Sequence, residues 1–185
     1  DRLVRRAAKT TDEISWDPGN ASINWPENYQ CDAVVHLAGA NIAEGRWTPE
    51  RREILVRSRI DSTRTLINGL GELSAVPKVL LCGTAIGIYG NRGDEELDEN
   101  SQNGAGFLVD LCRDWETAAE AASALGIRTV KLRTGIVLSP AGGALAKLLP
   151  LFKSAIGGPL GDGKFWQSWI SVDDWLRGAR HLIAD

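Results

Sequence analysis

VLLCGTAIGIYG, the stretch from Val79 to Gly90, indicates the fold most directly. Its first half is an unbroken apolar run, which is typical of a strand buried on both faces of a parallel sheet. The run stops at small residues and at one hydroxyl group, that of Thr84. Sheets of this kind present their functional groups at the carboxyl ends of the strands. The stretch therefore predicts a buried parallel strand that carries Thr84 to a functional edge.

Strand-like and helix-like segments alternate along the rest of the chain, a pattern that predicts a parallel sheet covered by helices. One long helix is expected over 48–70, where Thr48 suits the N-cap and Pro49 the first helical position. A second is expected over 107–125, before Gly126. The turn-rich stretch 10–30 is expected to be a surface excursion between two strands. The expected strands are Leu3–Arg5, Ala33–Leu37, Val79–Cys82 and Arg128–Leu132.

Size, charge and cysteine content exclude several classes of protein. With 185 residues, of which 43% are apolar, the chain can bury the core of one domain. The net charge of −3 does not provide the positive surface that nucleic-acid binding needs. No apolar run reaches the roughly 18 residues of a membrane span. Cys31, Cys82 and Cys112 are widely spaced among apolar residues. We therefore expect reduced core thiols in a cytoplasmic protein with no metal site, no nucleic-acid partner and no membrane partner.

Five longer motifs carry a family resemblance. They are VVHLAGAN (34–41), SRIDSTRTLI (58–67), CGTAIGIYGNRGDE (82–95), LRTGIVLSPAGGALAKLLPLFK (132–153) and GGPLGDGKFWQSWISVDDW (157–175). Together they resemble the atypical extended short-chain dehydrogenases, a group of NAD(P)-dependent, nucleoside-diphosphate-sugar epimerase-like proteins that is also called SulA-like. The resemblance covers nearly the whole chain, and its last two motifs are long enough to be specific.

The resemblance implies a Rossmann-type, doubly wound α/β domain in which helices cover both faces of a parallel sheet in three layers. It makes residues 1–185 an NAD(P)-binding domain that is incomplete at both ends, lacking the first strand with its glycine-rich phosphate loop and the small C-terminal domain. Residues 157–175 would begin the substrate-binding part.

The resemblance also implies where a dinucleotide cofactor would lie. The strand that ends at His36 would face the adenosine half, because the small residues after it allow close approach to the backbone. A tight turn with His36 satisfied in the core is the alternative. The backbone after the last strand would lie against the nicotinamide. The residues assigned to the cofactor are His36, Leu37, Ala38, Gly39, Cys82, Gly83, Arg133, Gly135 and Ile136.

Arg5 and Arg6 bear on the choice of cofactor. They follow the second strand of the family pattern, where an acidic residue would hold an unphosphorylated ribose and an arginine would accept a 2′-phosphate. They predict that NADP is preferred over NAD. A basic surface turn is the alternative.

Thr84 and Tyr89 are the expected catalytic residues. Members of the family also need a Tyr-x-x-x-Lys pair on the next helix, and here Gly106 and Asp110 stand where that pair would be. A phenol with a pKa near 10 needs a neighbouring ammonium to act near neutrality, and Asp110 would do the opposite. Two functions therefore stay open. One is an epimerase- or oxidoreductase-like enzyme that transfers hydride on a small polar, sugar-nucleotide-like substrate; the other is a non-catalytic NADP(H)-binding sensor or scaffold with a protein partner.

The stretch from Gly157 resembles the substrate-binding segment of the family. Gly158, Pro159, Gln167 and Trp169 are assigned to the substrate on this basis. Gln167 stands where the family has an arginine, and its amide cannot grip a diphosphate in charged bidentate geometry. This substitution argues against the usual nucleotide-diphosphate sugars.

Three further expectations concern the surface. Asp173 and Asp174 are expected to be helix-capping carboxylates. The acidic, glycine-rich stretch 90–106 is either a plain solvated loop or a lid. The two long helices carry several arginines on their outer faces, which would be costly to desolvate in a dimer. A monomer is therefore favoured.

Overall fold

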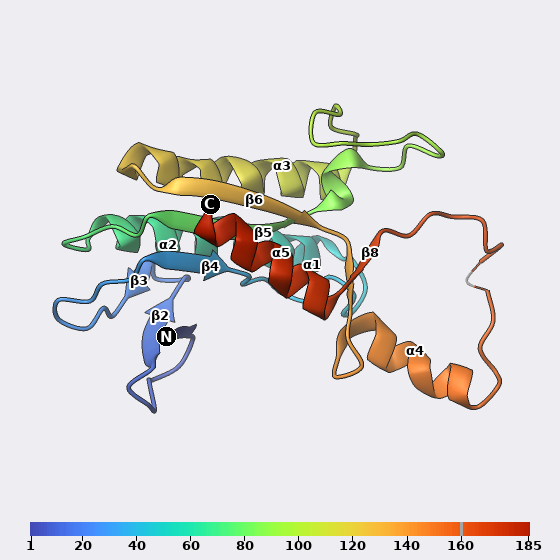
Figure 1. Ribbon diagram of the computed structural model, residues 1–185, viewed down its shortest axis with the longest axis horizontal. Helices are drawn as coiled ribbons and strands as arrows, with labels where there is room; N and C mark the ends of the chain where they lie inside the picture. Colours follow the sequence, from blue (N-terminus) through green and yellow to red (C-terminus); the bar gives the residue numbers. More distant parts are fainter. Residues whose placement is uncertain (160) are drawn as a thin grey trace.

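The computed structural model describes residues 1–159 and 161–185 and shows a parallel sheet between helices (Figure 1). Strand β5 (Val79–Ala85) lies between β4 (Ala33–His36) and β6 (Arg128–Thr134), and both pairs are parallel. The apolar run of β5 is buried on both faces, with Leu80 and Leu81 fully enclosed. The buried parallel strand predicted from the sequence is thus confirmed.

Helices cover both faces of this sheet. On one face, α2 (Ile60–Gly71) and α3 (Phe107–Glu120) pack together, and Leu66 and Leu70 of α2 enclose Leu80 of β5. On the other, α5 (Val172–Ala184) crosses in front of β5 in Figure 1. Full burial of one leucine side chain contributes roughly 1.5–3 kcal/mol, so these contacts hold the layers together. The three-layer, Rossmann-type α/β arrangement expected from the sequence is confirmed.

The ends of the helices follow local rules. The hydroxyl of Thr48 caps the first helix, as predicted. After α3 the chain makes a 3₁₀ turn, η2 (Ala121–Leu125), and stops at Gly126 in the left-handed conformation, φ +77°. The cap of α5 is Ser171, whose hydroxyl accepts the N–H of Asp174 at 3.0 Å and donates to the Asp174 carboxylate at 2.7 Å. Asp173 and Asp174 are therefore first-turn residues and not the caps that the sequence predicted. Within the described ranges no helix has the length and apolar character needed to cross a membrane.

The single helix expected over 48–70 is in fact two helices, α1 (Pro49–Arg57) and α2. The helical path breaks at Ser58 and Arg59 because both side chains reach the loop after β4. The hydroxyl of Ser58 accepts the N–H of Ala40 at 3.0 Å, and Arg59 donates to the carbonyl oxygen of Ala40 at 3.1 Å. Apolar spacing does not reveal a break that tertiary contacts cause.

The stretch 10–30 is not a surface excursion. It contains β2 (Glu13–Asp17) and β3 (Ser22–Ile23), and β2 pairs in parallel with β1 (Arg2–Val4). Ile14 and Trp16 of β2 are buried, and Trp16 packs with core residues of α2 and β5. The prediction was wrong because β2 has only 5 residues and is surrounded by turn-forming residues that dominate the local composition.

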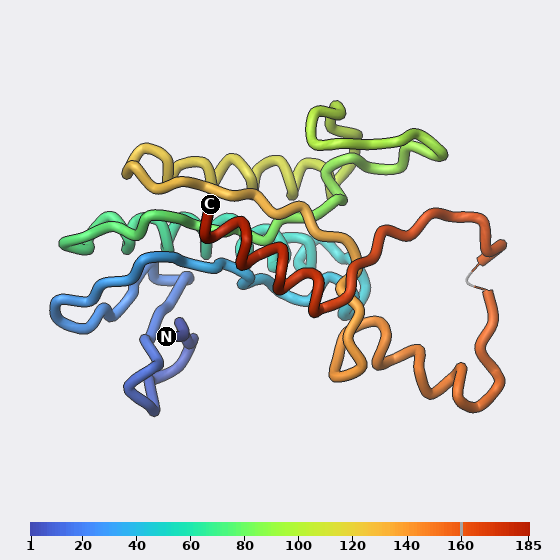
Figure 2. The backbone as a smooth tube through the Cα atoms, in the orientation of Figure 1, coloured from blue at the N-terminus to red at the C-terminus, as the bar shows by residue number. Residues whose placement is uncertain are grey.

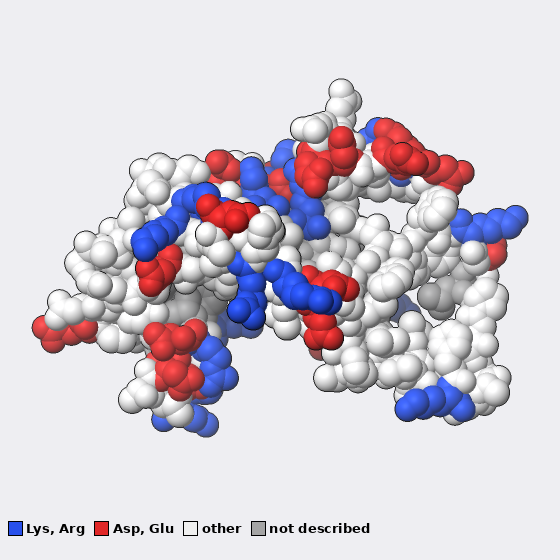
Figure 3. All heavy atoms as spheres, viewed as in Figure 1, with Lys and Arg blue, Asp and Glu red and all other residues white. Residues whose placement is uncertain are grey.

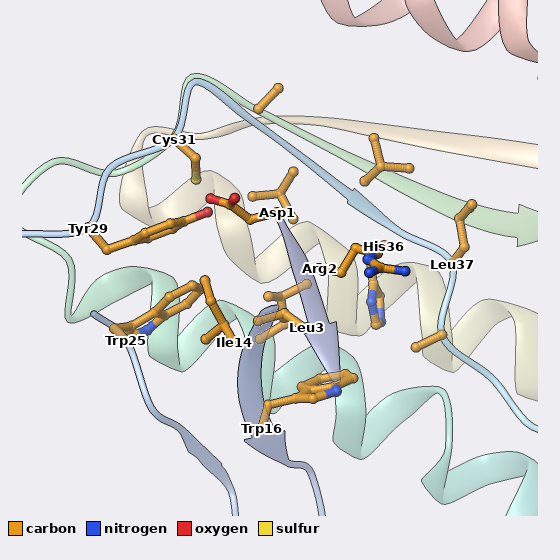
Figure 4. Close-up of a pocket in the computed structure, with 15 residues that line it drawn as sticks. Asp1, Arg2, Leu3, Ile14, Trp16, Trp25, Tyr29, Cys31, His36 and Leu37 are labelled. Carbon is orange, nitrogen blue, oxygen red and sulfur yellow. The ribbon is translucent and has the colours of Figure 1, made fainter. Parts of the chain in front are cut away.

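A groove separates the sheet β1–β2–β3 from the sheet β4–β5–β6. Among the residues that the structure describes, no strand bridges β1 and β4. A cavity of about 430 Å³ lies there, lined by Leu3, Ile14 and His36 among others (Figure 4).

One segment extends away from the sheet. β7 (Ile136–Leu138) pairs in parallel with β8 (Trp169–Ser171), and α4 (Gly143–Lys153) between them projects to one side (Figures 1 and 2). None of the residues of α4 is buried. Phe152 and Ile156 expose most of their apolar surface. This excursion is anchored at its two ends by the β7–β8 pair.

Candidate active site

Strands β5 and β6 bring two polar side chains to the carboxyl edge of the sheet. Their register pairs Thr84 with Arg133. After β5 the chain makes one turn, η1 (Ile86–Tyr89), which buries Tyr89 beside the strand end. Glu116 reaches the same place from α3. These four residues form one hydrogen-bonded group, named here the Arg133 network.

Arg133 is the centre of the network. Its guanidinium grips Glu116 with two hydrogen bonds, from Nε to Oε1 at 2.8 Å and from Nη2 to Oε2 at 2.9 Å. Its Nη1 donates to the phenolic oxygen of Tyr89 at 2.9 Å and to the carbonyl oxygen of Glu99 at 3.2 Å. The hydroxyl of Thr84 donates to Oε1 of Glu116 at 3.1 Å. A single bidentate ion pair therefore holds both predicted catalytic side chains in place.

The charges in the network are balanced. Glu116 is 7% exposed, and a buried carboxylate persists only when it is paired and hydrogen-bonded. The hydrogen bonds to Glu116 raise the pKa of Arg133 above its ordinary value, so the guanidinium stays charged. Burial raises the pKa of the nearby Cys112 thiol to about 11, which keeps that group neutral near pH 7.

The network also fixes which group donates and which accepts. Thr84 has a single hydroxyl proton and directs it at Glu116, so toward a ligand it offers only lone pairs. Tyr89 accepts from Arg133, which leaves its own proton for another acceptor. An acceptor and a donor thus stand at one strand end. They suit a ligand that carries both a hydroxyl group and an oxygen acceptor.

The α3 side chains that face this edge are Leu108 and Cys112 rather than Gly106 and Asp110. Gly106 is the N-cap, outside the helix, with φ +110°. Asp110 is exposed and pairs with an arginine on its own helix at 2.8 Å. A Cβ on Gly87, in the turn after β5, would instead meet the Sγ of Cys112 and the Cβ of Leu108. The predicted placement was wrong because α3 starts only at residue 107, yet its conclusion holds, since neither facing residue is a tyrosine or a lysine.

His36, at the end of β4, is satisfied in the core, as the alternative interpretation predicted. Its Nε2 lies 3.0 Å from the hydroxyl oxygen of Thr63, whose own proton goes to the carbonyl of Arg59 at 2.6 Å. This arrangement assigns the ring proton to Nε2. Burial lowers the pKa of His36 to about 4, so the ring is neutral. Leu37 and Ala38 beside it line the groove of Figure 4, and their contact with a cofactor stays a prediction.

Arg6 is already paired. Its Nη1 and Nη2 donate to the two carboxylate oxygens of Glu13 at 2.8 and 2.6 Å. These hydrogen bonds lower the pKa of Glu13 to about 2. No Asp or Glu follows the arginines directly in the sequence, and Glu13 reaches Arg6 from β2, a strand that the sequence did not predict. Arg5 is exposed, and its contact with a 2′-phosphate stays a prediction.

Three of the residues assigned to the cofactor pack against their own chain. Burial raises the pKa of the Cys82 thiol to about 12, and the residue is fully enclosed. A Cβ on Gly83 would lie 2.6 Å from a methyl carbon of Leu37. A Cβ on Gly135 would lie 2.5 Å from the carbonyl oxygen of Ser168, which accepts the N–H of Ile136 at 2.9 Å. The close approach that Gly135 permits is therefore made by the protein backbone.

The residues assigned to the substrate lie on the excursion. Gly158, Pro159 and Gln167 line a cavity of about 570 Å³ together with apolar side chains of α4. Trp169 lies in β8 and is largely exposed. The structure thus groups three of these residues in one apolar hollow, whose lining does not include Trp169.

The acidic loop 90–106 is tied down at several points. Arg92 pairs with Glu95 at 2.6 Å and donates to the carbonyl of Gln102 at 3.0 Å. The indole N–H of Trp166, on the excursion, donates to Asp94 at 2.8 Å. Figure 3 shows the acidic side chains gathered on this loop, next to the segment that carries Trp166. The loop therefore contacts both the Arg133 network, through Glu99, and the excursion.

A model of the NAD dependent epimerase/dehydratase family matches residues 2–185. The chain belongs to this family. An epimerase family protein of Mycobacterium bovis is 42% identical over 183 residues, covering 99% of this chain and 60% of that protein. An epimerase family protein of Arabidopsis thaliana, the chloroplastic SDR39U1 homologue, is 42% identical over 144 residues, covering 77% of this chain and 41% of that protein. The chain thus spans about 60% of the length of its mycobacterial relative.

Solved structures of the family agree with the fold. The nucleoside-diphosphate sugar epimerase of Corynebacterium glutamicum superposes with a TM-score of 0.82 at 37% identity, over 99% of this chain and 38% of that one. The human epimerase family protein SDR39U1, crystallised with NADPH, superposes with a TM-score of 0.85 at 29% identity, over 98% of this chain and 60% of that one. The resemblance inferred from the motifs is confirmed at the level of family and fold.

Proposed function

We propose that this protein binds NADP(H) and transfers hydride to or from a carbon of a small polar substrate, as an epimerase or oxidoreductase does. The observation that carries the proposal is the Arg133 network, which fixes an acceptor, Thr84, and a donor, Tyr89, at the carboxyl edge of the sheet. Small polar alcohols and ketones, including sugar-nucleotide-like compounds, have the matching groups.

The residues at the end of β4 fit a dinucleotide. Leu37 is 56% exposed at the groove, and Ala38 after it lines the same groove. Arg5 supplies an exposed guanidinium beyond β1, which supports NADP(H) over NAD(H). The human relative was crystallised with NADPH, which also supports NADP(H) for this protein. When bound, the cofactor supplies or accepts the hydride.

The chain's own groups orient the substrate. Thr84 accepts a hydrogen bond from the substrate hydroxyl, and Tyr89 donates one to a substrate oxygen. Glu116 and Arg133 position these two side chains without meeting the substrate. Gln167 on the excursion replaces the family's arginine, which supports a substrate other than the usual nucleotide-diphosphate sugars.

Location and partners follow from the same chemistry. The thiols of Cys31, Cys82 and Cys112 are free, which suits the reducing cytoplasm. We propose a small-molecule substrate and no nucleic-acid or membrane partner, because the net charge is −3 and acidic side chains gather beside the site.

The test uses the purified protein at its natural length. Titration calorimetry should show NADPH binding, and spectrophotometry at the NADPH band should show turnover with small polar carbonyl compounds but little with UDP- or dTDP-sugars. Thr84→Val should reduce turnover at least about tenfold with NADPH affinity unchanged, because the acceptor is lost. Thr117→Val, an exposed threonine on α3, is the matched control. Absence of NADPH binding, or robust UDP-galactose epimerisation that depends on Thr84, would contradict the proposal.

One observation favours a second candidate, a non-catalytic NADP(H)-binding sensor or scaffold. Leu108 and Cys112 stand at the edge where the family pattern needs a tyrosine and a lysine. A sensor would bind NADPH with the same affinity in wild type and Thr84→Val and would show no turnover with any carbonyl compound. The same titrations therefore separate the two candidates.

A further inference from the structure

The acidic loop 90–106 is rooted beside the Arg133 network by a narrow neck. It starts at Gly90, directly after Tyr89, and returns at Gly104, whose N–H donates to the carbonyl oxygen of Ile88 at 3.0 Å. Gly104 has to be a glycine, because a Cβ there would collide with the carbonyl oxygen of Tyr89. A closed neck of this kind is typical of an Ω-loop, which keeps a compact shape of its own.

The excursion is rooted on the other side of the network. It follows directly on β6, the strand of Arg133, and its two ends are joined by the hydrogen bond from Ile136 to Ser168 at 2.9 Å. Trp166 lies two residues before Ser168, and its indole N–H donates to Asp94 of the loop at 2.8 Å. Among the residues that the structure describes, no other hydrogen bond or ion pair joins the loop to the excursion.

The loop, the excursion and the network together close a ring. At the base of the ring Arg133 donates to Tyr89, and at its far point Trp166 donates to Asp94, where Figure 3 shows the two segments next to each other. The ring stands at the carboxyl ends of β5 and β6, the edge at which parallel sheets bind their ligands. A ligand that contacts Tyr89 at this edge therefore lies at the base of both arms of the ring.

The two arms differ in how firmly they are held. Within the loop, Arg92 pairs with Glu95 and donates to the carbonyl of Gln102. Arg133 also holds the loop, through the carbonyl of Glu99. Helix α4 of the excursion, in contrast, has no buried residue. Because elements with few buried contacts open at the lowest free-energy cost, the loop is the fixed arm and the excursion the moving one.

The hydrogen bond between the arms is suited to opening and closing. Trp166 is 80% exposed and Asp94 is exposed as well, so water competes for both partners. A hydrogen bond of this kind shifts an equilibrium by about tenfold or less. The open and the closed ring are therefore both accessible, and a ligand that contacts the two arms together favours the closed one.

We propose that Trp166 and Asp94 form a latch by which the excursion closes over a substrate bound at the Arg133 network and opens to admit it. The acidic loop 90–106 is then the fixed half of a lid rather than a plain solvated loop. Closure excludes water from the reacting groups, which favours hydride transfer. The role of the latch toward a substrate rests on the proposed function, whereas the opening and closing of the ring do not.

The first measurement needs no ligand and uses the purified protein at its natural length. Spin labels are placed on Glu96→Cys in the loop and Lys164→Cys in the excursion, both exposed positions. The other accessible cysteines, Cys31 among them, are replaced by serine. Pulsed electron paramagnetic resonance then reports the distance between the two arms, and the wild-type latch should give a main short distance and a minor longer one.

Two variants break the latch from its two sides. Trp166→Phe removes the indole N–H and Asp94→Ala removes its acceptor, and both side chains are exposed, so the fold is kept. Each should raise the ratio of long to short distances several-fold, up to about tenfold. Trp47→Phe is the matched control, because the indole N–H of Trp47 donates elsewhere, to the carbonyl of Ile42 at 3.1 Å. An unchanged distance distribution in both variants would overturn the latch.

The second measurement links the latch to the substrate. With a carbonyl compound that the protein turns over, Trp166→Phe should raise KM up to about tenfold and leave kcat and the affinity for NADPH unchanged, because the latch only changes the population of the closed ring. A lower kcat at unchanged KM would overturn this role. A distance shift in a protein that turns over no carbonyl compound would leave the opening ring standing and refute the proposed function.

Discussion

Removing the cation of the Arg133 network should destabilise the protein more than any exposed charge change. In Arg133→Met, Glu116 keeps only its contact with Thr84 and loses two hydrogen bonds, of 2.8 and 2.9 Å, to a guanidinium. The two side chains are 22% and 9% exposed, so solvent screens this pair little. Breaking a buried ion pair by removing one partner costs about 3–5 kcal/mol, because the other charge stays buried without compensation.

The assay is urea unfolding at pH 7, followed by circular dichroism. The free energy of unfolding should fall by about 3 kcal/mol or more in Arg133→Met, and Glu116→Gln in the same protein should recover part of this loss because it removes the orphaned charge. Arg113→Met, an exposed arginine on α3, should leave the unfolding curve unchanged. A loss below about 1 kcal/mol in Arg133→Met, or no recovery in the double variant, would refute a buried, mutually dependent pair.

Three other outcomes are expected. Arg5→Ala should reduce the preference for NADPH over NADH about tenfold or more. Arg6→Ala should reduce it less, because Arg6 is already paired with Glu13. Equal titration curves for wild type and Arg5→Ala would show that Arg5 belongs to a basic surface turn. The pKa of His36 is lowered to about 4 in the folded protein, so the unfolded chain takes up the imidazole proton at a higher pH than the folded chain. The free energy of unfolding should therefore fall as the pH drops from about 6.5 to 4. His36→Gln should flatten this pH dependence of the urea midpoint, and an unchanged dependence would assign it to other groups. Sedimentation should show a monomer at micromolar protein, and a concentration-independent dimer would reverse this expectation.

The sequence was most informative where local pattern and tertiary role coincide. The apolar run of β5 and the N-cap at Thr48 belong to this class, because buried strands and helix starts have strong local signatures. The break at Ser58 was not predictable, since a contact with Ala40 causes it and helical spacing continues through it. Strand β2 was missed because it is short. Its alternation of buried and exposed residues indicates a strand only once its pairing partner, β1, is known.

The candidate site was predicted in part. Thr84 and Tyr89 are linked at one edge through Glu116 and Arg133, and Glu116 was missed. One signal was present: Leu108, Cys112 and Glu116 recur every fourth residue and so share one face of α3. A carboxylate on an otherwise buried face needs a cation, and only the fold shows that Arg133 from β6 supplies it.

The bond between the N–H of Ile136 and the carbonyl of Ser168 makes the excursion an exchangeable module. Both of its ends are fixed to one frame, and Gly135 is small enough to let them touch. Insertions, deletions or a wholly different α4 can then be accepted between β7 and β8 without moving Thr84, which is held from the other side by α3. In such a molecule, substrate specificity can change through the sequence of the excursion while the Arg133 network at the sheet edge stays constant.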